Sequence, residues 1–285
     1  MSKQNYFKNI LIPVDGSTSC IRAKLLTALI AKKFQSKVTV VNVVSHNFMH
    51  PELKANYQLP SEVLNKLDNV YSDAGKKYLR QAKELFEEEH IDVSSELIKA
   101  EDSAEAVIEM VKERNYDLVV IGNRAPHSEQ FALGPVSEKV SMYASCPVLI
   151  SKGKTDLKKL LVAVDGSKLS NKAVDYAVEL AKKFDAKLTL LHVEEKKLFN
   201  LERDLSQKIG EKILLDAERR ICDVEYEKKM IAGTPWEIIL DMAKDGDFDL
   251  VVMGSRGMSS VKRFLLGSVS AEVSMLVQSS VLLVR

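Results

Sequence analysis

The sequence predicts an α/β protein built from two tandem copies of one domain. Two observations support this: a long internal repeat, and short apolar runs that alternate with amphipathic helical patterns. The run NILIPVDGS, which ends at Ser17, recurs as KLLVAVDGS, which ends at Ser167, and AKKF at 31–34 recurs at 181–184. An internal repeat defines the folding unit, and a unit of half the chain is too long for a solenoid repeat. We therefore interpret it as a duplicated domain.

A third pair of matching segments locates an insertion in the first copy. YDLVVIG ends at Gly122 and FDLVVMG ends at Gly254, so the offset between the copies falls from 150 residues to 132. The first copy thus carries 18 additional residues between its second strand and this run. We expect them around Ser45–Pro60, before a long helix over Ser61–His90. An apolar stripe on that helix is expected to face the core: Leu64, Leu67, Tyr71, Ala74, Tyr78 and Leu85.

The second copy illustrates the order of elements. Short continuous apolar runs are typical of strands buried on both faces, and helical spacing of apolar residues predicts helices between them. Thr234-Pro-Trp-Glu237 predicts a helix start with Thr as N-cap, Pro in the first turn and Glu completing a capping box. Asp102-Ser-Ala-Glu105 takes the same place in the first copy. The predicted strands are Leu160–Val164, Leu188–Val193, Val224–Met230, Leu250–Met253 and Val281–Val284, with helices near 173–184 and 199–221 and a last helix after Gly267.

Each copy therefore reads βαβαβαβαβ, which predicts a parallel sheet with helices on both faces, a Rossmann-like arrangement. The predicted domains are 1–152 and 157–285, joined by a short polar link at Ser151–Asp156. In such sheets, ligands bind beyond the carboxyl ends of the strands, where the strand order reverses. The turns that follow Val164, Val193 and Met253 are expected to meet there.

Composition restricts the function further. Of 285 residues, 46% are apolar and 28% charged, and the net charge is +1. This balance does not favour a nucleic-acid binder or a protein of anionic membranes. No run approaches the ~20 apolar residues that span a bilayer, and the first residues form too short an apolar run for a secretory signal. The three cysteines are widely spaced without a CxxC pair, which favours reduced thiols and a cytoplasmic location.

One loop of the second copy carries the chemistry. Gly254-Ser-Arg-Gly257 follows the fourth strand, and nine residues later Gly267-Ser268 begins a helix. Glycines allow close backbone approach to an anion, and a helix N-terminus favours phosphate. Arg256, Lys262 and Arg263 add positive charge, and Ser268 and Ser270 offer hydroxyls to phosphate oxygens or to a hydrated metal. Singly, each residue also has an ordinary reading as a turn glycine, a helix cap or a solvated cation.

This pattern, together with VDGS after the first strand, resembles the universal stress protein family in its tandem-domain form, over nearly the whole chain. The resemblance implies five-stranded parallel sheets of order 3-2-1-4-5 and, in the second copy, an ATP site, with Mg²⁺ held through the phosphates. In the ATP-binding members, an aspartate after the first strand lies by the ribose and adenine, and a backbone group at the end of the second strand pairs with adenine. The implied nucleotide-binding residues are Ala163, Asp165, Val193, Met253, Gly254, Arg256, Gly257, Gly267, Ser268, Val269 and Ser270. Ala163 stands where the ATP-binding pattern often has Pro.

The first copy departs from the loop pattern. It reads Gly122-Asn-Arg-Ala125, then only eight residues, then Gly134-Pro135. The second glycine is Ala, and the final Ser is Pro, which lacks a hydroxyl and an N–H. Glu129 would repel a triphosphate, although Pro13, Asp15 and Val43 keep the nucleoside end of the pattern. We predict that this copy does not bind ATP tightly, and leave open a weak nucleoside or other ligand.

The leading hypothesis is a cytoplasmic, ATP-binding stress-response or regulatory protein that is read by an unknown protein partner. No catalytic residue is predicted, since His192, the single histidine of the second copy, is expected to be buried in a strand. A slow ATPase or self-phosphorylating protein, with Ser259, Ser260, Ser268 or Ser270 as acceptor, stays an alternative. So does an interaction module with ATP as a structural ligand.

Partners follow from the strand edges. The last strands of the two copies are apolar, at Cys146–Ser151 and Val281–Arg285. Because an exposed apolar edge strand favours pairing, we expect the two copies to pair with each other within the chain. A homodimer of whole chains is a further possibility. No metal site is predicted. His46 and His50 are four residues apart but have no evident third ligand.

Overall fold

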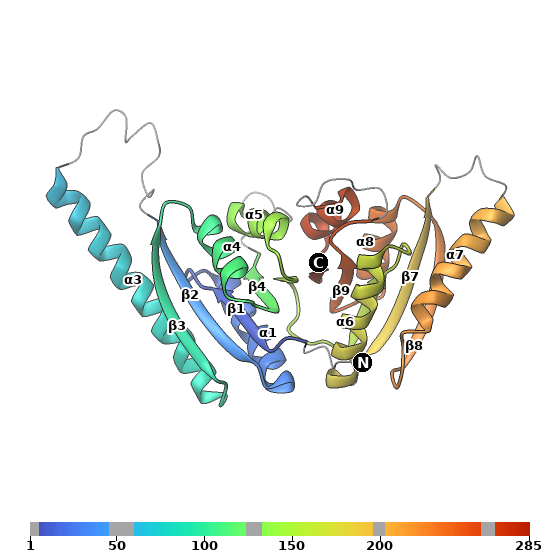
Figure 1. Ribbon diagram of the computed structural model, residues 1–285, viewed down its shortest axis with the longest axis horizontal. Coiled ribbons are helices and arrows are strands. Elements are labelled where there is room, and N and C mark those ends of the chain that lie inside the picture. Colours follow the sequence, from blue (N-terminus) through green and yellow to red (C-terminus); the bar gives the residue numbers. More distant parts are fainter. Residues whose placement is uncertain (1–5, 46–59, 124–132, 196–202, 258–265) are drawn as a thin grey trace.

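A computed structural model describes residues 6–45, 60–123, 133–195, 203–257 and 266–285. Two halves of the same design lie side by side (Figure 1). The first half contains β1 Asn9–Pro13, α1 Thr18–Phe34, β2 Lys37–Ser45, α3 Ser61–Glu88, β3 Val93–Ala100, α4 Ser103–Glu113, β4 Leu118–Gly122, α5 Pro135–Tyr143 and β5 Val148–Ser151. The second half contains β6 Lys159–Ala163, α6 Lys168–Phe184, β7 Lys187–Glu195, α7 Arg203–Glu218, β8 Tyr226–Gly233, α8 Pro235–Asp245, β9 Leu250–Gly254, α9 Ser268–Leu276 and β10 Ser280–Val284.

All strands join one ten-stranded sheet of order β3-β2-β1-β4-β5-β10-β9-β6-β7-β8. Pairing within each half is parallel, in the predicted order 3-2-1-4-5. β5 and β10 pair antiparallel, with Leu149 opposite Leu282 and one residue pair on either side. The expected pairing of the two copies through their last strands is thus confirmed. The two five-stranded parallel sheets therefore share an edge, because both last strands are apolar and each covers the other.

Two apolar cores cover the two faces of this sheet. Residues of α1, α3, α6 and α7 form one core, and residues of α4, α5, α8 and α9 form the other. Successive strand residues alternate between them, since Ile10 and Ile12 face the first core and Leu11 the second. Leu149 and Leu282 belong to the first core, so this core is continuous across the junction between the halves.

Helix starts follow the sequence signals with one exception. Asp102 accepts hydrogen bonds from the backbone N–H groups of Ala104 and Glu105, as expected of an N-cap. Thr234 stands at the N-cap of α8 with Pro235 in the first turn, but its side chain makes no capping hydrogen bond. The expected capping box of Thr234 is therefore wrong in its side-chain contacts, although the helix begins where predicted.

The long helix of the first half has nearly the predicted length, but not all of its predicted core residues are buried. α3 covers Ser61–Glu88. Its buried residues run from Ser72 to Phe86, whereas Leu64 is 41% and Tyr71 is 44% exposed. The expectation that the whole stripe faces the core is wrong for these two residues, because the helix extends past the edge of the sheet (Figure 1).

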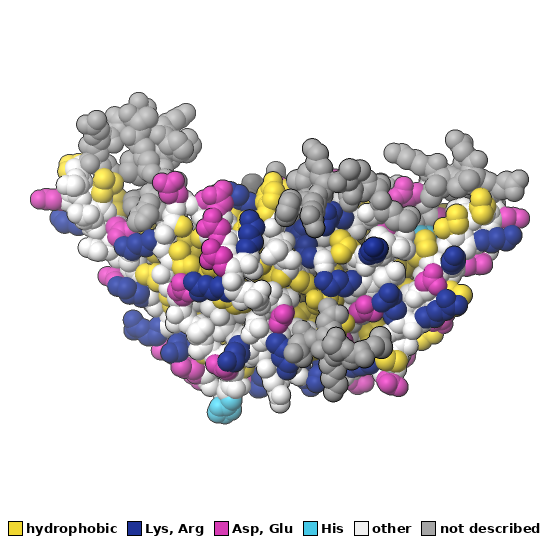
Figure 2. All heavy atoms as spheres, in the orientation of Figure 1, with side chains coloured by type: hydrophobic (Ala, Val, Ile, Leu, Met, Phe, Trp, Pro, Cys, Tyr) yellow, Lys and Arg dark blue, Asp and Glu magenta, His cyan; other side chains and the backbone are white. Residues whose placement is uncertain are grey.

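Charges on the surface are mixed. Basic and acidic side chains are interspersed over the face in Figure 2, and no single-sign patch stands out. No helix in the described part of the chain is long and apolar enough to cross a membrane. Several sequence predictions fall outside the described residues: His46, His50, Glu129, Ser259, Ser260, Lys262 and Arg263.

Candidate functional site

The turn after β6 begins the site. Gly166 has φ of +84°, a conformation that favours glycine, and Oδ1 of Asp165 accepts a hydrogen bond of 2.9 Å from the backbone N–H of Ser167. Ser167 in turn caps α6, since its Oγ accepts from the backbone N–H of Ser170 at 3.1 Å. One oxygen of Asp165 thus holds the turn. The first half repeats this arrangement with Asp15 and Ser17 at 3.0 Å.

Three glycines bring the loop after β9 against this turn. A β-carbon on Gly254 would lie 3.0 Å from backbone atoms of Leu169 and Ser170, in the first turn of α6. A β-carbon on Gly257 would lie 2.6 Å from Oδ2 of Asp165, and one on Gly267 would lie 3.3 Å from the Cα of Arg256. Real β-carbons essentially never come within 3.0 Å of a neighbour. The glycines therefore allow backbone segments to approach that other residues would hold apart.

The start of α9 closes the loop. Gly267 is the N-cap, and its N–H donates to the carbonyl of Ser255 at 2.9 Å. Ser268, the first helical residue, is exposed, and Val269 is half-buried. Ser270 is 3% exposed, and its Oγ donates to the carbonyl of Gly254 at 2.8 Å. Its hydroxyl hydrogen is therefore used to tie α9 to β9.

The strand residues of the predicted site lie at neighbouring strand ends. Ala163 pairs with Met253 on one side and with Leu191 on the other. Met253 is buried, and Val193 is half-buried two residues beyond Leu191. The structure thus gathers Ala163, Asp165, Met253 and the glycine loop at the carboxyl ends of adjacent strands, with Val193 on the next strand.

His192 is buried, as expected, and has a structural contact that the sequence did not reveal. Its Nδ1 is 2.8 Å from the carbonyl oxygen of Val164, directly before the Asp165 turn. Asn42 makes the same link in the first half, from Nδ2 to the carbonyl of Val14 at 2.6 Å. A polar side chain in the second strand therefore fixes the end of the first strand in both halves.

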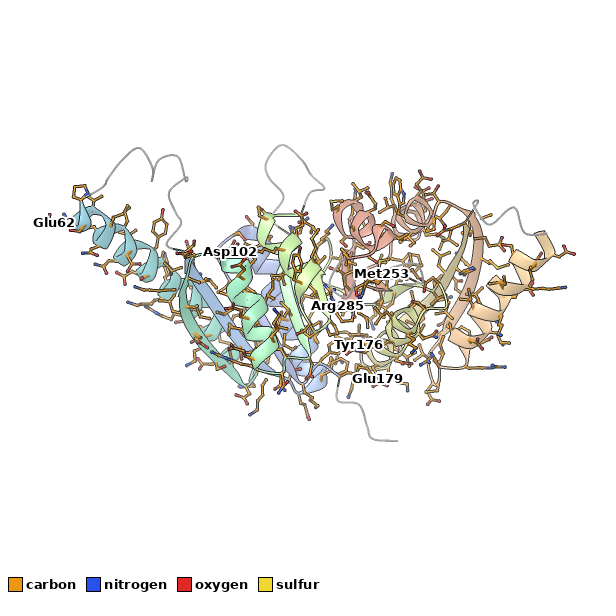
Figure 3. All side chains as sticks on the ribbon, turned by 45° about the horizontal axis from the view of Figure 1, so that its top comes forward. Glu62, Asp102, Tyr176, Glu179, Met253 and Arg285 are labelled. Atoms are coloured by element: carbon orange, nitrogen blue, oxygen red, sulfur yellow. The ribbon has the colours of Figure 1, made fainter. Side chains whose placement is uncertain are left out.

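Arg256 has a neighbour that sequence reasoning missed. Ser255 donates its N–H to the carbonyl of Val284 at 2.8 Å, so Arg256 and Arg285 follow two hydrogen-bonded strand ends. Burial, and then the positive charge of Arg256, lower the pKa of Arg285 to about 10. Figure 3 shows Arg285 between the two halves. Its position at the last residue gives no periodic signal that could have revealed this.

The first half contains a cavity of about 380 Å³ at the place that corresponds to the Asp165 turn and the glycine loop of the second half. Among its walls are Asp15, Asn42, Val43 and Gly122, together with the start of α5. No Lys or Arg is among the described residues that line it. Pro135 occupies the first turn of α5.

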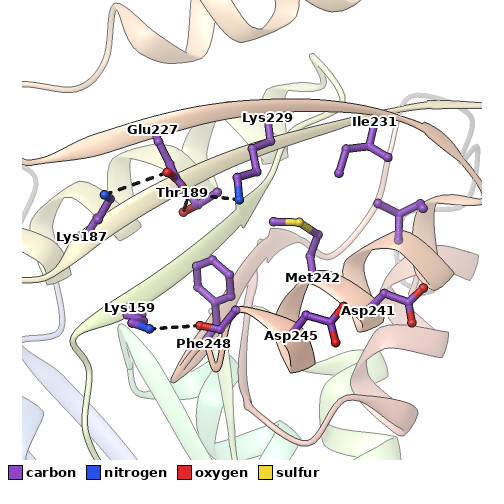
Figure 4. Close-up of a pocket in the computed structure, with 12 residues that line it drawn as sticks. Lys159, Lys187, Thr189, Glu227, Lys229, Ile231, Asp241, Met242, Asp245 and Phe248 are labelled. Atoms are coloured by element: carbon purple, nitrogen blue, oxygen red, sulfur yellow. Dashed lines mark hydrogen bonds and ion pairs between the residues drawn. The ribbon is translucent and has the colours of Figure 1, made fainter.

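A second cavity, of about 510 Å³, lies away from these residues (Figure 4). It lies between α8 and the outer strands of the second half, over Phe248, Met242 and Ile231, with Lys159, Lys187 and Lys229 at its rim. None of the predicted nucleotide-binding residues lines it. It therefore does not belong to the predicted site.

Comparison with known proteins decides the family. The model of the universal stress protein family matches residues 6–152 and again residues 156–285. The chain belongs to the universal stress protein family. Universal stress protein YxiE of Bacillus subtilis is 39% identical over 145 residues, which are 45% of this chain and 98% of that relative. A universal stress protein of Methanocaldococcus jannaschii is 30% identical over 148 residues, 48% of this chain and 87% of its own length.

Solved structures support the universal stress protein fold over both halves together. A universal stress protein from Archaeoglobus fulgidus covers 97% of this chain and 98% of its own, with a TM-score of 0.73 and 22% identity. At that identity the likeness concerns the fold alone. The tandem arrangement of two universal stress protein domains is therefore established for this chain, and the role of its individual site residues is argued below from their geometry.

Proposed function

We propose that the second half binds ATP at the Asp165 turn and the glycine loop, and that the chain is a nucleotide-binding regulatory protein of the stress response. The observation that carries this proposal is the convergence of Gly254, Gly257 and Gly267 on one turn and two helix starts. A β-carbon at either of the first two would meet a carboxylate or backbone atoms. Backbone N–H groups at such a place can approach a phosphate closely, and the N-terminus of α9 favours negative charge.

Some residues of the proposed site would contact the nucleotide, and others hold the contacting groups in place. Oδ1 of Asp165 is engaged by the turn, so Oδ2 is the oxygen available to a ribose hydroxyl. The exposed hydroxyl of Ser268 and the N–H groups of Gly257 and Val269 suit phosphate oxygens. We propose that the whole predicted set surrounds the nucleotide, with Mg²⁺ entering on the phosphates. The set is Ala163, Asp165, Val193, Met253, Gly254, Arg256, Gly257, Gly267, Ser268, Val269 and Ser270.

A regulatory role is favoured over rapid hydrolysis. His192 is buried, and its Nδ1 is engaged at Val164, so it does not offer a general base to the phosphates. Ser270 is buried against Gly254, which disfavours it as a phosphate acceptor. The proposed chemistry is reversible binding, with the domains 1–152 and 157–285 playing unequal roles. The first-half cavity, whose described walls carry no basic residue, suits at most an uncharged nucleoside.

Nucleotide content and stoichiometry test the proposal. The full chain is purified, denatured and analysed by mass for released nucleotide, and the emptied protein is titrated with ATP by calorimetry. We expect one ATP per chain. Asp165→Ala should weaken the binding by about a hundredfold, and Asp15→Ala should preserve it. The two aspartates make matching hydrogen bonds of 2.9 and 3.0 Å to their turns, so both variants should lose similar stability. Two equivalent ATP sites, or no binding at saturating ATP, would refute the proposal.

A further inference from the structure

The last residues of the two halves make reciprocal contacts across the junction. Lys152 follows β5, and its Nζ donates to the carbonyl of Ser274 in α9 at 2.6 Å. Arg285 follows β10, and its Nη2 donates to the carbonyl of Ser141 in α5. The antiparallel pairing of β5 and β10 places the two basic residues in equivalent positions. Each half therefore caps the last helix of the other.

The two caps differ in how completely their donors are used. The ammonium of Lys152 has three donors, and it donates to three carbonyls, those of Ser274, Met275 and Val277. The guanidinium of Arg285 has five donors. Its Nε is buried and has no hydrogen-bond partner among the described residues. The cap made by Lys152 is saturated, whereas the cap made by Arg285 keeps a buried donor, Nε, without a partner among the described residues.

Other polar atoms near Arg285 are also without partners. Ser141, whose carbonyl accepts from Arg285, has a fully buried Oγ with no partner in the described part of the chain. The same holds for Oγ of Ser255, whose N–H pairs with the residue before Arg285. Each such group costs about 1 to 3 kcal/mol when left unsatisfied. Several of them around one half-buried cation indicate a bound water or ion.

The charge of this place is positive. Lys172 of α6 donates to the main-chain carboxylate oxygen of Arg285 at 2.5 Å, and burial lowers the pKa of Lys172. Arg256 stands beside Arg285 at the end of the neighbouring strand. Neither Arg285 nor Lys172 forms an ion pair with an Asp or Glu side chain among residues 6–45, 60–123, 133–195, 203–257 and 266–285. The nearby Cys146 thiol is neutral, since burial raises its pKa to about 12.

We propose that the junction of the two halves binds a phosphate-like oxyanion between Arg256 and Arg285. A guanidinium fork matches the geometry of phosphate oxygens, and two forks balance a dianion. The anion would also accept from the Nε of Arg285. This site goes beyond the proposed function, because it can be filled by free inorganic phosphate. The terminal phosphate of a nucleotide in the second half is the other source of the same chemistry.

Thermal unfolding of the nucleotide-free full chain tests this site. Inorganic phosphate is compared with chloride at equal ionic strength, so that general screening cancels. We expect phosphate to raise the unfolding midpoint of the wild type, by linkage to the native state. Arg285→Gln should weaken phosphate binding by about tenfold or more. Lys152→Gln, the matched variant of the saturated cap, should keep the full response.

Further variants separate the two sources of phosphate. Arg256→Gln leaves the hydrogen bond from Arg285 to the carbonyl of Ser141 in place. This variant should reduce the rise in unfolding midpoint that phosphate causes, even if Arg285→Gln folds poorly. If Arg285→Gln weakens ATP binding but not adenosine binding, the anion between Arg256 and Arg285 is a phosphate group of the nucleotide. If ATP binding is unchanged while the phosphate response is lost, the anion is free phosphate. An equal midpoint in phosphate and chloride, together with unchanged ATP affinity in Arg285→Gln, would overturn this site and leave the ATP proposal standing.

Discussion

Asp165 and Gly257 are so close that a β-carbon on Gly257 would lie 2.6 Å from Oδ2 of Asp165. The two residues come from the ends of β6 and β9, which are adjacent strands. Because Oδ1 of Asp165 is held by the N–H of Ser167, the carboxylate cannot turn away without breaking the turn. The absence of a side chain at position 257 therefore leaves the space that Oδ2 of Asp165 occupies.

Gly257→Ala is expected to weaken ATP binding by about tenfold, which is ~1.4 kcal/mol. The added methyl group must displace Oδ2 of Asp165 or move the loop, while the exposed position of Gly257 keeps the effect on folding small. Calorimetric titration measures the affinity.

A double-mutant cycle supplies the control for this prediction. In an Asp165→Ala background the clash is gone, so Gly257→Ala should change ligand affinity much less than in the wild type. Equal effects of Gly257→Ala in both backgrounds would show that the two residues do not act through each other.

A hydrogen bond from a serine at the start of the last helix of each half to the end of the fourth strand, here called the serine clasp, gives a second prediction. Ser270 donates to the carbonyl of Gly254 at 2.8 Å, and Ser137 donates to the carbonyl of Gly122 at the same distance. The contact persists in the half whose loop pattern is broken, which favours a structural role. Ser270→Ala and Ser137→Ala should each lower the free energy of unfolding by about 1 to 3 kcal/mol, because the carbonyl of a buried or half-buried glycine loses a donor.

Ligand affinity separates the structural role of Ser270 from a role in binding. For a clasp, Ser270→Ala should change ATP affinity by less than about twofold, well under 1 kcal/mol. Chemical denaturation and calorimetry on the two variants give both quantities. If Ser270→Ala loses affinity strongly while its stability matches that of Ser137→Ala, the hydroxyl contacts the nucleotide.

Arg114 and Glu96 give a third prediction, from a difference between the halves. Their bidentate pair, at 2.5 and 3.1 Å, joins the end of α4 to β3. In the second half Gly246 follows α8 in the position of Arg114, and Lys229 of β8 stands in the position of Glu96, next to the cavity of Figure 4. Both partners of the first-half pair are well exposed, at 46% and 38% of their side chains.

A cycle of Arg114→Met and Glu96→Gln should yield a coupling of no more than about 1 kcal/mol, since water and salt screen an exposed pair. The hydrogen bond from Arg114 lowers the pKa of Glu96. The coupling should therefore be complete above the usual pKa of a glutamate and decline as the pH falls below it. Denaturation at two pH values and two salt concentrations measures it. A coupling that is unchanged by salt would contradict this account.

Local patterns explain how much of the fold the sequence could predict. Apolar runs such as Leu160–Val164 reveal buried strands because burial on both faces leaves a continuous run, and the repeat fixed the order of the elements twice. The pairing of β5 with β10 also followed, because two apolar edges need cover. The exposed start of α3 could not be predicted, since periodicity shows which face of a helix is apolar and not how far the sheet beneath it extends.

The candidate site was predictable where it depends on backbone freedom and less so where it depends on distant contacts. Gly254 and Gly257 are visible as glycines, and their close contacts with α6 and Asp165 fit that reading. The links made by Arg285 and Lys152 join residues more than 120 positions apart through carbonyl groups, which carry no sequence signal. Such contacts become visible only once the two halves are placed together.

Lys152 provides the last prediction, a dependence of stability on pH. The side chain is buried, and burial lowers its pKa to about 8 from an ordinary value of 10.5. The unfolded chain therefore binds this proton more tightly than the folded chain, and between about pH 8 and pH 10.5 unfolding takes up protons at this site. The contribution of Lys152 to stability should accordingly rise with pH across that interval and be smallest below it.

Lys152→Met isolates the contribution of Lys152 to the pH dependence of stability, because all other titrating groups are shared with the wild type. The difference in unfolding free energy between the two proteins should shift in favour of the wild type by on the order of 2 to 3 kcal/mol from neutral pH to pH ~10. Denaturant unfolding at a series of pH values measures it. The three carbonyls that accept from Nζ oppose the shift by stabilising the charged form. A difference that stays constant with pH would mean that these hydrogen bonds fully compensate for burial.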